Sequence, residues 1–104
     1  MNNSAKLSAS KKQLLFAGMQ SLLSAGLDFS TSFSLLIESE QNTKLKNLLS
    51  SLYQSVLSGS SLWEAMQSSG CFSSLDAGIV RIGEQTGKIN EALEFLSDYY
   101  RRRM

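Results

Sequence analysis

Apolar residues recur at intervals of three and four positions along most of this chain, a spacing that predicts amphipathic α-helices. The clearest run predicts a helix over residues 42–58. Asn42 is suited to cap the start of this helix, and Gly59 is suited to end it. The apolar positions of the run are Leu45, Leu48, Leu49, Leu52, Tyr53, Val56 and Leu57.

The same spacing predicts two helices earlier in the chain. The first covers residues 11–24 and is followed by Gly26, where a left-handed residue would stop it. A shorter helix covers residues 30–38, with Ser30 as its N-cap and Phe33 on its apolar stripe. The apolar face predicted for the first helix consists of Leu14, Leu15, Gly18, Met19, Leu22 and Leu23.

A short fourth helix is predicted after Gly59 from a capping box. The stretch Ser61-Leu62-Trp63-Glu64 allows the Ser61 hydroxyl to accept the Glu64 amide while the Glu64 carboxylate accepts the Ser61 amide. This reciprocal pair satisfies two backbone donors that the first turn of a helix leaves free. The predicted helix ends at Gly70.

Two further helices complete the chain. Ser73 or Ser74 is the predicted cap of a fifth helix, which ends at Gly87. A sixth helix is predicted over residues 90–103. The residues expected on one face of the fifth helix are Leu75, Ile79, Ile82 and Gly83.

The predicted fold is all-α, a compact six-helix bundle, because no window alternates with the period of two that strands require. Its 104 residues suffice for one domain with a single core. We expect a flexible N-terminal segment over residues 1–10 and a helical domain over residues 11–104. The side chains predicted to form the core are Leu15, Leu22, Phe33, Leu48, Leu52, Val56, Ile79, Leu93 and Leu96.

Composition narrows the function. The net charge of +1 is too balanced to indicate binding to nucleic acid. Histidine is absent, which removes the commonest general base and the commonest metal ligand, so we expect no enzyme, no metal and no cofactor. The lone cysteine, Cys71, fits a reducing compartment and is expected as a small buried side chain. No secretory signal or membrane-spanning run is present, which indicates a soluble chain as given.

The stretch Gly83-Glu84-Gln85-Thr86-Gly87 could be a phosphate loop, the place of a catalytic acid, or a joint between helices. A phosphate loop would need a preceding strand and a lysine after the second glycine. A catalytic Glu84 would need a nearby partner group. We therefore expect a joint, in which Gly83 lets a neighbouring helix approach, Gly87 is left-handed, and Glu84 accepts backbone amides at a nearby helix start.

The end of the sequence, Tyr99-Tyr100-Arg101-Arg102-Arg103, allows two interpretations. It could be a helix C-terminus whose cations suit the helix dipole, with Asp98 paired to Arg102. It could equally be a membrane-proximal segment, because aromatic residues and clustered arginines are typical of the cytoplasmic boundary of a membrane span. Three charges without an apolar anchor predict only weak binding of the isolated domain to anionic vesicles.

The order of several motifs resembles a known family. These are "AGLDFSTSFSLL", a long leucine helix, "VLSGSSLWEAM" and "CFSSLDAGIVRIGEQTGKINEALEFLSDYYRRR". Together they resemble the type II secretion F-domain family, the inner-membrane platform proteins of type II secretion and type IV pilus assembly systems. The resemblance covers residues 14–103. It implies a six-helix domain on the cytoplasmic side of the bacterial inner membrane, the first of two such domains, in a full-length protein embedded in the membrane.

The resemblance also implies partners. The domain would be a non-catalytic scaffold that contacts the assembly ATPase and other inner-membrane platform proteins. It could form a homodimer through exposed apolar side chains of the short helices over residues 30–38 and 61–70. The alternative is a soluble helical adaptor or regulatory bundle that binds a partner helix. About twenty apolar residues encoded after Met104 would favour the platform protein.

Overall fold

The structure is a computed structural model that describes residues 6–104 of the chain. These residues form six α-helices and no strand, which confirms the all-α prediction. The helices are α1 (Ala9–Ser24), α2 (Phe29–Ser39), α3 (Thr43–Leu57), α4 (Leu62–Ser69), α5 (Ser74–Thr86) and α6 (Ile89–Arg101).

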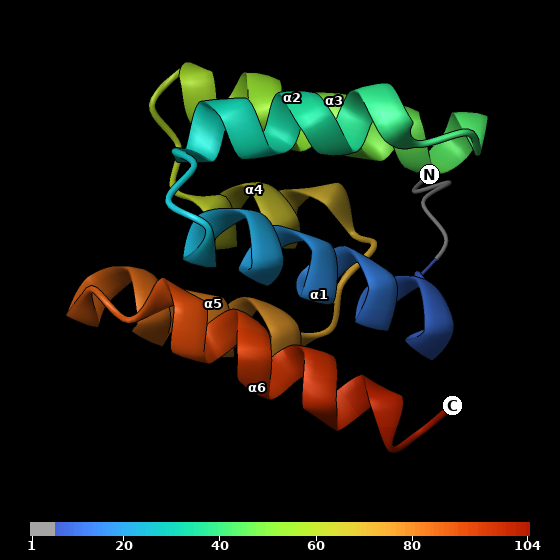
Figure 1. Ribbon diagram of the computed structural model, residues 1–104, viewed down its shortest axis with the longest axis vertical. Helices are drawn as coiled ribbons and strands as arrows, with labels where there is room; N and C mark the ends of the chain where they lie inside the picture. Colours follow the sequence, from blue (N-terminus) through green and yellow to red (C-terminus); the bar gives the residue numbers. More distant parts are fainter. Residues whose placement is uncertain (1–5) are drawn as a thin grey trace.

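The helices form a closed ring. Each helix packs against the next one in the chain, and α6 packs back against α1 in the most extensive contact of the fold. Figure 1 shows α2 and α3 together at one edge, α1 and α4 in the middle, and α5 and α6 at the opposite edge. The ring therefore brings the first and last helices side by side.

Two predicted helix starts were wrong. α1 begins at Ala9, two residues before its expected start, because the Ser8 side chain accepts the Lys11 amide and caps the helix. α2 begins at Phe29, because Asp28 accepts the Thr31 amide over 2.7 Å and takes the capping role expected for Ser30. A carboxylate beside the positive end of a helix dipole is a favourable cap.

The other predicted caps are confirmed. Asn42 caps α3, Ser61 and Glu64 form the capping box of α4, and Ser73 caps α5 in a second box with Asp76. The backbone also takes left-handed conformations where the sequence predicted that helices stop, with φ of 92° at Gly26 and 110° at Gly59.

The division of the chain at residue 10 stays a prediction, since residues 1–5 lie outside the described residues. The residues just before α1 contact the link between α4 and α5. The Leu7 amide donates to the Cys71 carbonyl over 3.0 Å, and the Lys6 ammonium donates to the Phe72 carbonyl over 3.0 Å. These bonds join the start of α1 to the start of α5.

One core fills the ring. Of the residues predicted to be buried, Leu15, Phe33, Leu52, Leu93 and Leu96 are buried. The remaining four are only partly buried, and they are Leu22, Leu48, Val56 and Ile79. The largest fully buried side chains include Phe16 and Met66, neither of which was among the core residues predicted from the sequence.

Four leucine and isoleucine side chains assigned to apolar faces are exposed, which corrects those faces. They are Leu14, Leu57, Leu75 and Ile82. In α1 the buried stripe consists of Lys12, Leu15, Phe16 and Met19. The predicted face of α1 was wrong because Lys12 is buried, whereas charged residues in a sequence pattern are expected on the solvent side.

Candidate functional site

The joint between α5 and α6 is built around two glycines. Gly87 has φ of 71°, the left-handed conformation predicted for it, and the Lys88 amide donates to the Gly83 carbonyl over 2.8 Å to close the helix end. Gly83 lies where α6 approaches α5 closely, because a Cβ added there would lie 2.7 Å from the Ala92 Cβ. The close approach predicted at Gly83 is therefore present.

Glu84 contacts the start of α4. Its two carboxylate oxygens accept the backbone amides of Leu62 over 2.9 Å and Trp63 over 2.8 Å. The Ser61 hydroxyl accepts the next amide, that of Glu64. All amide donors of the first turn of α4 are thus bonded, and a negative charge lies at the positive end of its dipole. This is the role predicted for Glu84. Both oxygens of this carboxylate, which the sequence also offered as a candidate catalytic acid, accept backbone amides.

The Trp63 side chain of α4 contacts α5. The Arg81 guanidinium lies 4.7 Å from the centre of the Trp63 ring, within the range of a cation–π contact. Trp63 is partly buried against the core, as expected from the sequence. One turn of α5 therefore holds α4 through Arg81 and Glu84 together.

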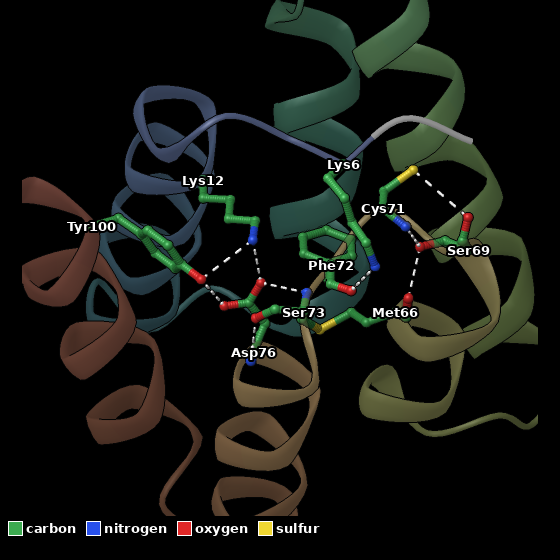
Figure 2. A network of polar contacts seen from close by, with 9 residues as sticks. All are labelled: Lys6, Lys12, Met66, Ser69, Cys71, Phe72, Ser73, Asp76 and Tyr100. Atoms are coloured by element: carbon green, nitrogen blue, oxygen red, sulfur yellow. Dashed lines mark hydrogen bonds and ion pairs between the residues drawn. The ribbon is translucent and has the colours of Figure 1, made fainter. Parts of the chain in front are cut away.

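A buried polar network joins three helices, and Figure 2 shows its residues at close range. Lys12 of α1 lies 2.7 Å from the Asp76 carboxylate of α5. The Tyr100 hydroxyl of α6 donates to the other oxygen of Asp76 over 2.5 Å. The relative exposures are 6% for Lys12, 0% for Asp76 and 8% for Tyr100, so this ion pair lies inside the protein.

The network satisfies its own buried groups. Asp76 also accepts the Ser73 amide over 2.9 Å, so both of its oxygens have partners. Lys12 donates to the Tyr100 hydroxyl over 3.3 Å and lies 4.8 Å from the centre of that ring. A buried ion pair is tolerated only when its remaining hydrogen-bonding capacity is filled in this way.

Burial and hydrogen bonding change the pKa values of the network. Burial raises the pKa of the Tyr100 hydroxyl, and its hydrogen bond to Asp76 raises it further. For Lys12 burial lowers the pKa, but the bonds to Asp76 and Tyr100 outweigh burial, so that the net pKa is raised. Lys12 therefore stays charged and Tyr100 stays neutral at physiological pH.

Sequence reasoning missed Lys12 and Asp76. Two signals could have indicated them: Lys12 falls four residues before Phe16 on the stripe of α1, and Ser73-x-x-Asp76 has the spacing of a capping box. Neither signal shows that the two residues meet, because that contact depends on how α1 and α5 pack. The network joins α1, α5 and α6 through the side chains of Lys12, Asp76 and Tyr100.

The membrane-proximal residues predicted at the chain end divide between the core and the surface. Tyr100 is buried in the network, whereas Tyr99 is half-buried and Arg101, Arg102 and Arg103 are exposed. The pairing of Asp98 with Arg102 was wrong, because Asp98 pairs with Arg101 over 2.6 Å. α6 ends at Arg101, so Arg102 is the C-cap residue and does not lie within the helix one turn after Asp98.

Within residues 6–104, no helix is long and apolar enough to cross a membrane, and no group of acidic, cysteine or histidine side chains is arranged to hold a metal ion. Cys71 is half-buried and packs against the core. Among the described residues, Asp76 is the buried carboxylate, and half-buried Glu84 accepts backbone amides of α4.

These features define a small all-α domain whose buried and half-buried polar groups hold its helices together. The family described as type II secretion system (T2SS), protein F, has a model that matches residues 16–104. The match begins within α1 and includes every helix after it. The chain therefore belongs to the type II secretion system protein F family. A search of curated proteins gave no match.

Proposed function

We propose that the chain is the cytoplasmic domain of an inner-membrane platform protein for type IV pilus assembly or type II secretion. In this proposal it is a non-catalytic scaffold that contacts the assembly ATPase and other inner-membrane components. The observation that carries the proposal is the family match, which covers most of α1 and all of α2 to α6. The soluble adaptor considered from the sequence has no observation of its own in its favour.

The use of the interior carboxylates supports a scaffold over an enzyme. Asp76 is buried and Glu84 is half-buried at contacts between helices, and both oxygens of each accept hydrogen bonds from the fold itself. A general acid or base needs a group free to reach a substrate. These carboxylates instead fix how α4, α5 and α6 meet.

The closed ring supports a role in transmitting force or position. Lys12, Asp76 and Tyr100 join α1, α5 and α6 through bonds whose directions are fixed, while Glu84 joins α5 to α4. A partner that pushes on one of these helices would move them together, because packed interiors deform little. In our proposal the ring is the rigid element that couples the ATPase to the membrane platform.

The chain end supports the proposed location. Arg101, Arg102 and Arg103 are all exposed, and clustered cations keep a segment on the cytoplasmic side of a membrane. In the full-length protein, changing all three to glutamine should disturb topology or assembly and leave the isolated domain about as stable. A topology reporter placed in the full-length protein measures the first effect. If topology and assembly are both unchanged, the cluster is only a cationic helix end.

A homodimer is a further part of the proposal, with one correction to its basis. α2 exposes Leu35, but α4 exposes no large apolar side chain, so the second of the two expected surfaces is absent. A stable dimer would bury at least about 1,000 Å² in total. Sedimentation of the domain at high concentration should show a dimer that Leu35→Asp dissociates, and a strictly monomeric wild type would argue against an autonomous dimer.

The central experiment measures binding between residues 1–104 and the assembly ATPase of the same organism. We expect saturable binding by calorimetry. We also expect one of three substitutions on separate helices, Leu14→Asp, Leu35→Asp or Leu57→Asp, to weaken it by about tenfold or more. Circular dichroism would confirm that each variant is folded. The scaffold proposal fails if wild-type protein does not bind and the same changes leave assembly unaffected in the full-length protein.

A further inference from the structure

The outer side of the α5–α6 pair has apolar side chains next to arginines. We call this surface the α6 strip and define it as Ile82, Phe95, Tyr99, Arg102 and Arg103. Ile82 is 60% exposed and Phe95 is 49% exposed, which is high for side chains of this size. Two shallow hollows meet at Phe95, one lined by Ile82 and Ala92 and the other by Tyr99 and both arginines. The strip is therefore continuous.

No helix of the described residues covers the α6 strip, so a flat surface can contact it. The opposite side of α6 is buried through Leu93, Leu96 and Tyr100, and α6 packs only against α1 and α5 within the described residues. In Figure 1 α5 and α6 form one outer edge of the molecule, and the chain leaves α6 at the corner of that edge.

The aromatic side chains of the strip are stacked with its cation. The rings of Phe95 and Tyr99 are 6.1 Å apart and nearly parallel. The Arg103 guanidinium lies 3.4 Å from the centre of the Tyr99 ring and donates to the Tyr99 carbonyl over 3.0 Å. Arginine held on an aromatic face keeps donors available for a phosphate while its stem covers apolar surface.

The charge of the strip is positive at its C-terminal end. Residues 95–103 contain three arginines and one acid, Asp98, whose carboxylate is bonded to Arg101. Glu91, in the first turn of α6, lies 3.7 Å from Lys88. Among the described residues, Arg102 and Arg103 have no carboxylate within ion-pair distance. An anionic surface would therefore complement this end of the strip.

We propose that the α6 strip binds the surface of a membrane that contains anionic phospholipids. Arg102 and Arg103 pair with lipid phosphates, the Tyr99 ring lies at headgroup depth, and Phe95 and Ile82 enter the apolar boundary. The strip supplies the apolar anchor that sequence reasoning found missing, so binding is stronger than the cations alone predict. The inference deepens the proposed function, because a domain of an inner-membrane platform protein has such a surface beside it.

The test is co-sedimentation of residues 1–104 with vesicles. We expect binding to phosphatidylcholine mixed with phosphatidylglycerol and little binding to phosphatidylcholine alone. Replacing both Arg102 and Arg103 by glutamine should weaken binding roughly 30-fold, since each cation near an anionic surface contributes about fivefold. Phe95→Ala should weaken it roughly fivefold, and this loss should persist in high salt, which screens only the charges.

Matched controls lie on α3, at the opposite edge of the ring. Lys44 and Lys46 are exposed, so replacing both by glutamine removes the same charge away from the strip. Leu57 is 58% exposed and is the control for Phe95. Neither control should change vesicle binding by more than about twofold, the range expected for a distant surface change.

Several outcomes would overturn the proposal. Equal binding to both kinds of vesicle, or equal loss in the lysine and arginine variants, would show that the strip recognises no anionic membrane. If Phe95→Ala instead dissociates a dimer and leaves vesicle binding unchanged, the strip is a contact between copies of the chain. If the wild-type domain binds vesicles but not the ATPase, only the scaffold proposal is contradicted. If it binds the ATPase but not anionic vesicles, only the lipid contact is contradicted.

Discussion

The α5–α6 pair and the α2–α3 pair are both helical hairpins with short links, yet different interactions hold them. In α5–α6 the contacts are directional: Tyr100 donates to Asp76, and Gly83 leaves space that Ala92 fills. In α2–α3 the contacts are stacked rings, with Phe33 centred 5.8 Å from Tyr53, and the polar bond of that tyrosine to Ser30 is exposed. One hairpin fixes a geometry, whereas the other mainly buries apolar area.

This difference has a functional consequence. Apolar contacts tolerate small shifts at modest cost, whereas a buried ion pair or a glycine contact loses its stabilisation when helices move. We therefore expect the α5–α6 side, together with α1, to keep its shape when a partner binds. α2 and α3 are the helices more free to adjust. Substitutions that separate these two behaviours test the comparison.

The largest effect is expected at Asp76. Asp76→Ala should lower the free energy of unfolding by about 3–5 kcal/mol, because Lys12 would be left buried without its counter-charge. Urea unfolding measures this loss. The matched change on the other hairpin is Asp28→Ala, which removes an exposed cap and should cost only about 1 kcal/mol. Equal losses at both aspartates would contradict the comparison.

A double substitution sharpens the same prediction. Lys12→Met combined with Asp76→Ala removes both charges, and it should lose less stability than Asp76→Ala alone because no buried charge remains. If the double variant is instead the less stable of the two, the network contributes mainly through packing of the Lys12 stem.

The next largest effect is expected in the apolar core of α3. Leu52 is 2% exposed, so Leu52→Ala should cost about 2–5 kcal/mol through lost burial and the cavity left behind. Leu57→Ala, five residues along the same helix, removes the same atoms from a side chain that is 58% exposed. It should change stability by about 0.5 kcal/mol or less. A loss below about 0.5 kcal/mol at Leu52 would show that its burial is misassigned.

The contrast between the hairpins also explains what the sequence could predict. The helix at residues 42–58 was found almost to its ends, because a leucine stripe and the Asn42 cap are local signals. The contact of Glu84 with amides of another helix was predicted, because the stretch around Glu84 lacks the lysine of a phosphate loop and the partner group of a catalytic acid. The pairing of Lys12 with Asp76 was not, since 64 positions separate them and only tertiary packing brings them together.

A smaller effect is expected at Gly83, where space is limited. Gly83→Ala should cost about 1–3 kcal/mol, because the added Cβ would lie 2.7 Å from the Ala92 Cβ and one helix must shift. Gly78 is in the same helix and has nothing within 4 Å of an added Cβ. Gly78→Ala should therefore stabilise the protein, by up to about 1 kcal/mol. Thermal unfolding of both variants decides whether close approach or helix propensity dominates in α5.

A still smaller loss is expected at the joint itself. Gly87→Ala should cost about 1–2 kcal/mol, because φ of 71° places the new side chain in the left-handed region. Nothing lies within 4 Å of the added Cβ, so the cost comes from the backbone alone. Gly87→Asn should lose less, since asparagine tolerates this conformation better. Equal losses for alanine and asparagine would point to a lost contact rather than to backbone conformation.

The smallest effect on stability at neutral pH comes from the titration of tyrosine and lysine side chains. The change of stability with pH should have opposite signs for the groups of the two regions. The pKa of Tyr100 is raised by burial and by Asp76 above its ordinary 10.0, and that of Lys12 is raised above 10.5. The unfolded chain therefore releases these protons first, and stability falls as pH rises above about 10. The pKa of half-buried Tyr53 is lowered by its hydrogen bond with Ser30, so its titration acts in the opposite direction.

Urea unfolding at neutral pH and at steps above pH 10.0, the ordinary tyrosine pKa, measures both signs. Tyr100→Phe should flatten the alkaline loss of stability, because one of the two protons held by the fold is gone. Tyr53→Phe should leave the loss in place or steepen it slightly, because the group of opposite sign has been removed. If both variants flatten the loss to the same extent, the buried network does not hold its protons more tightly than the α2–α3 hairpin does. The two hairpins would then differ in burial but not in electrostatics.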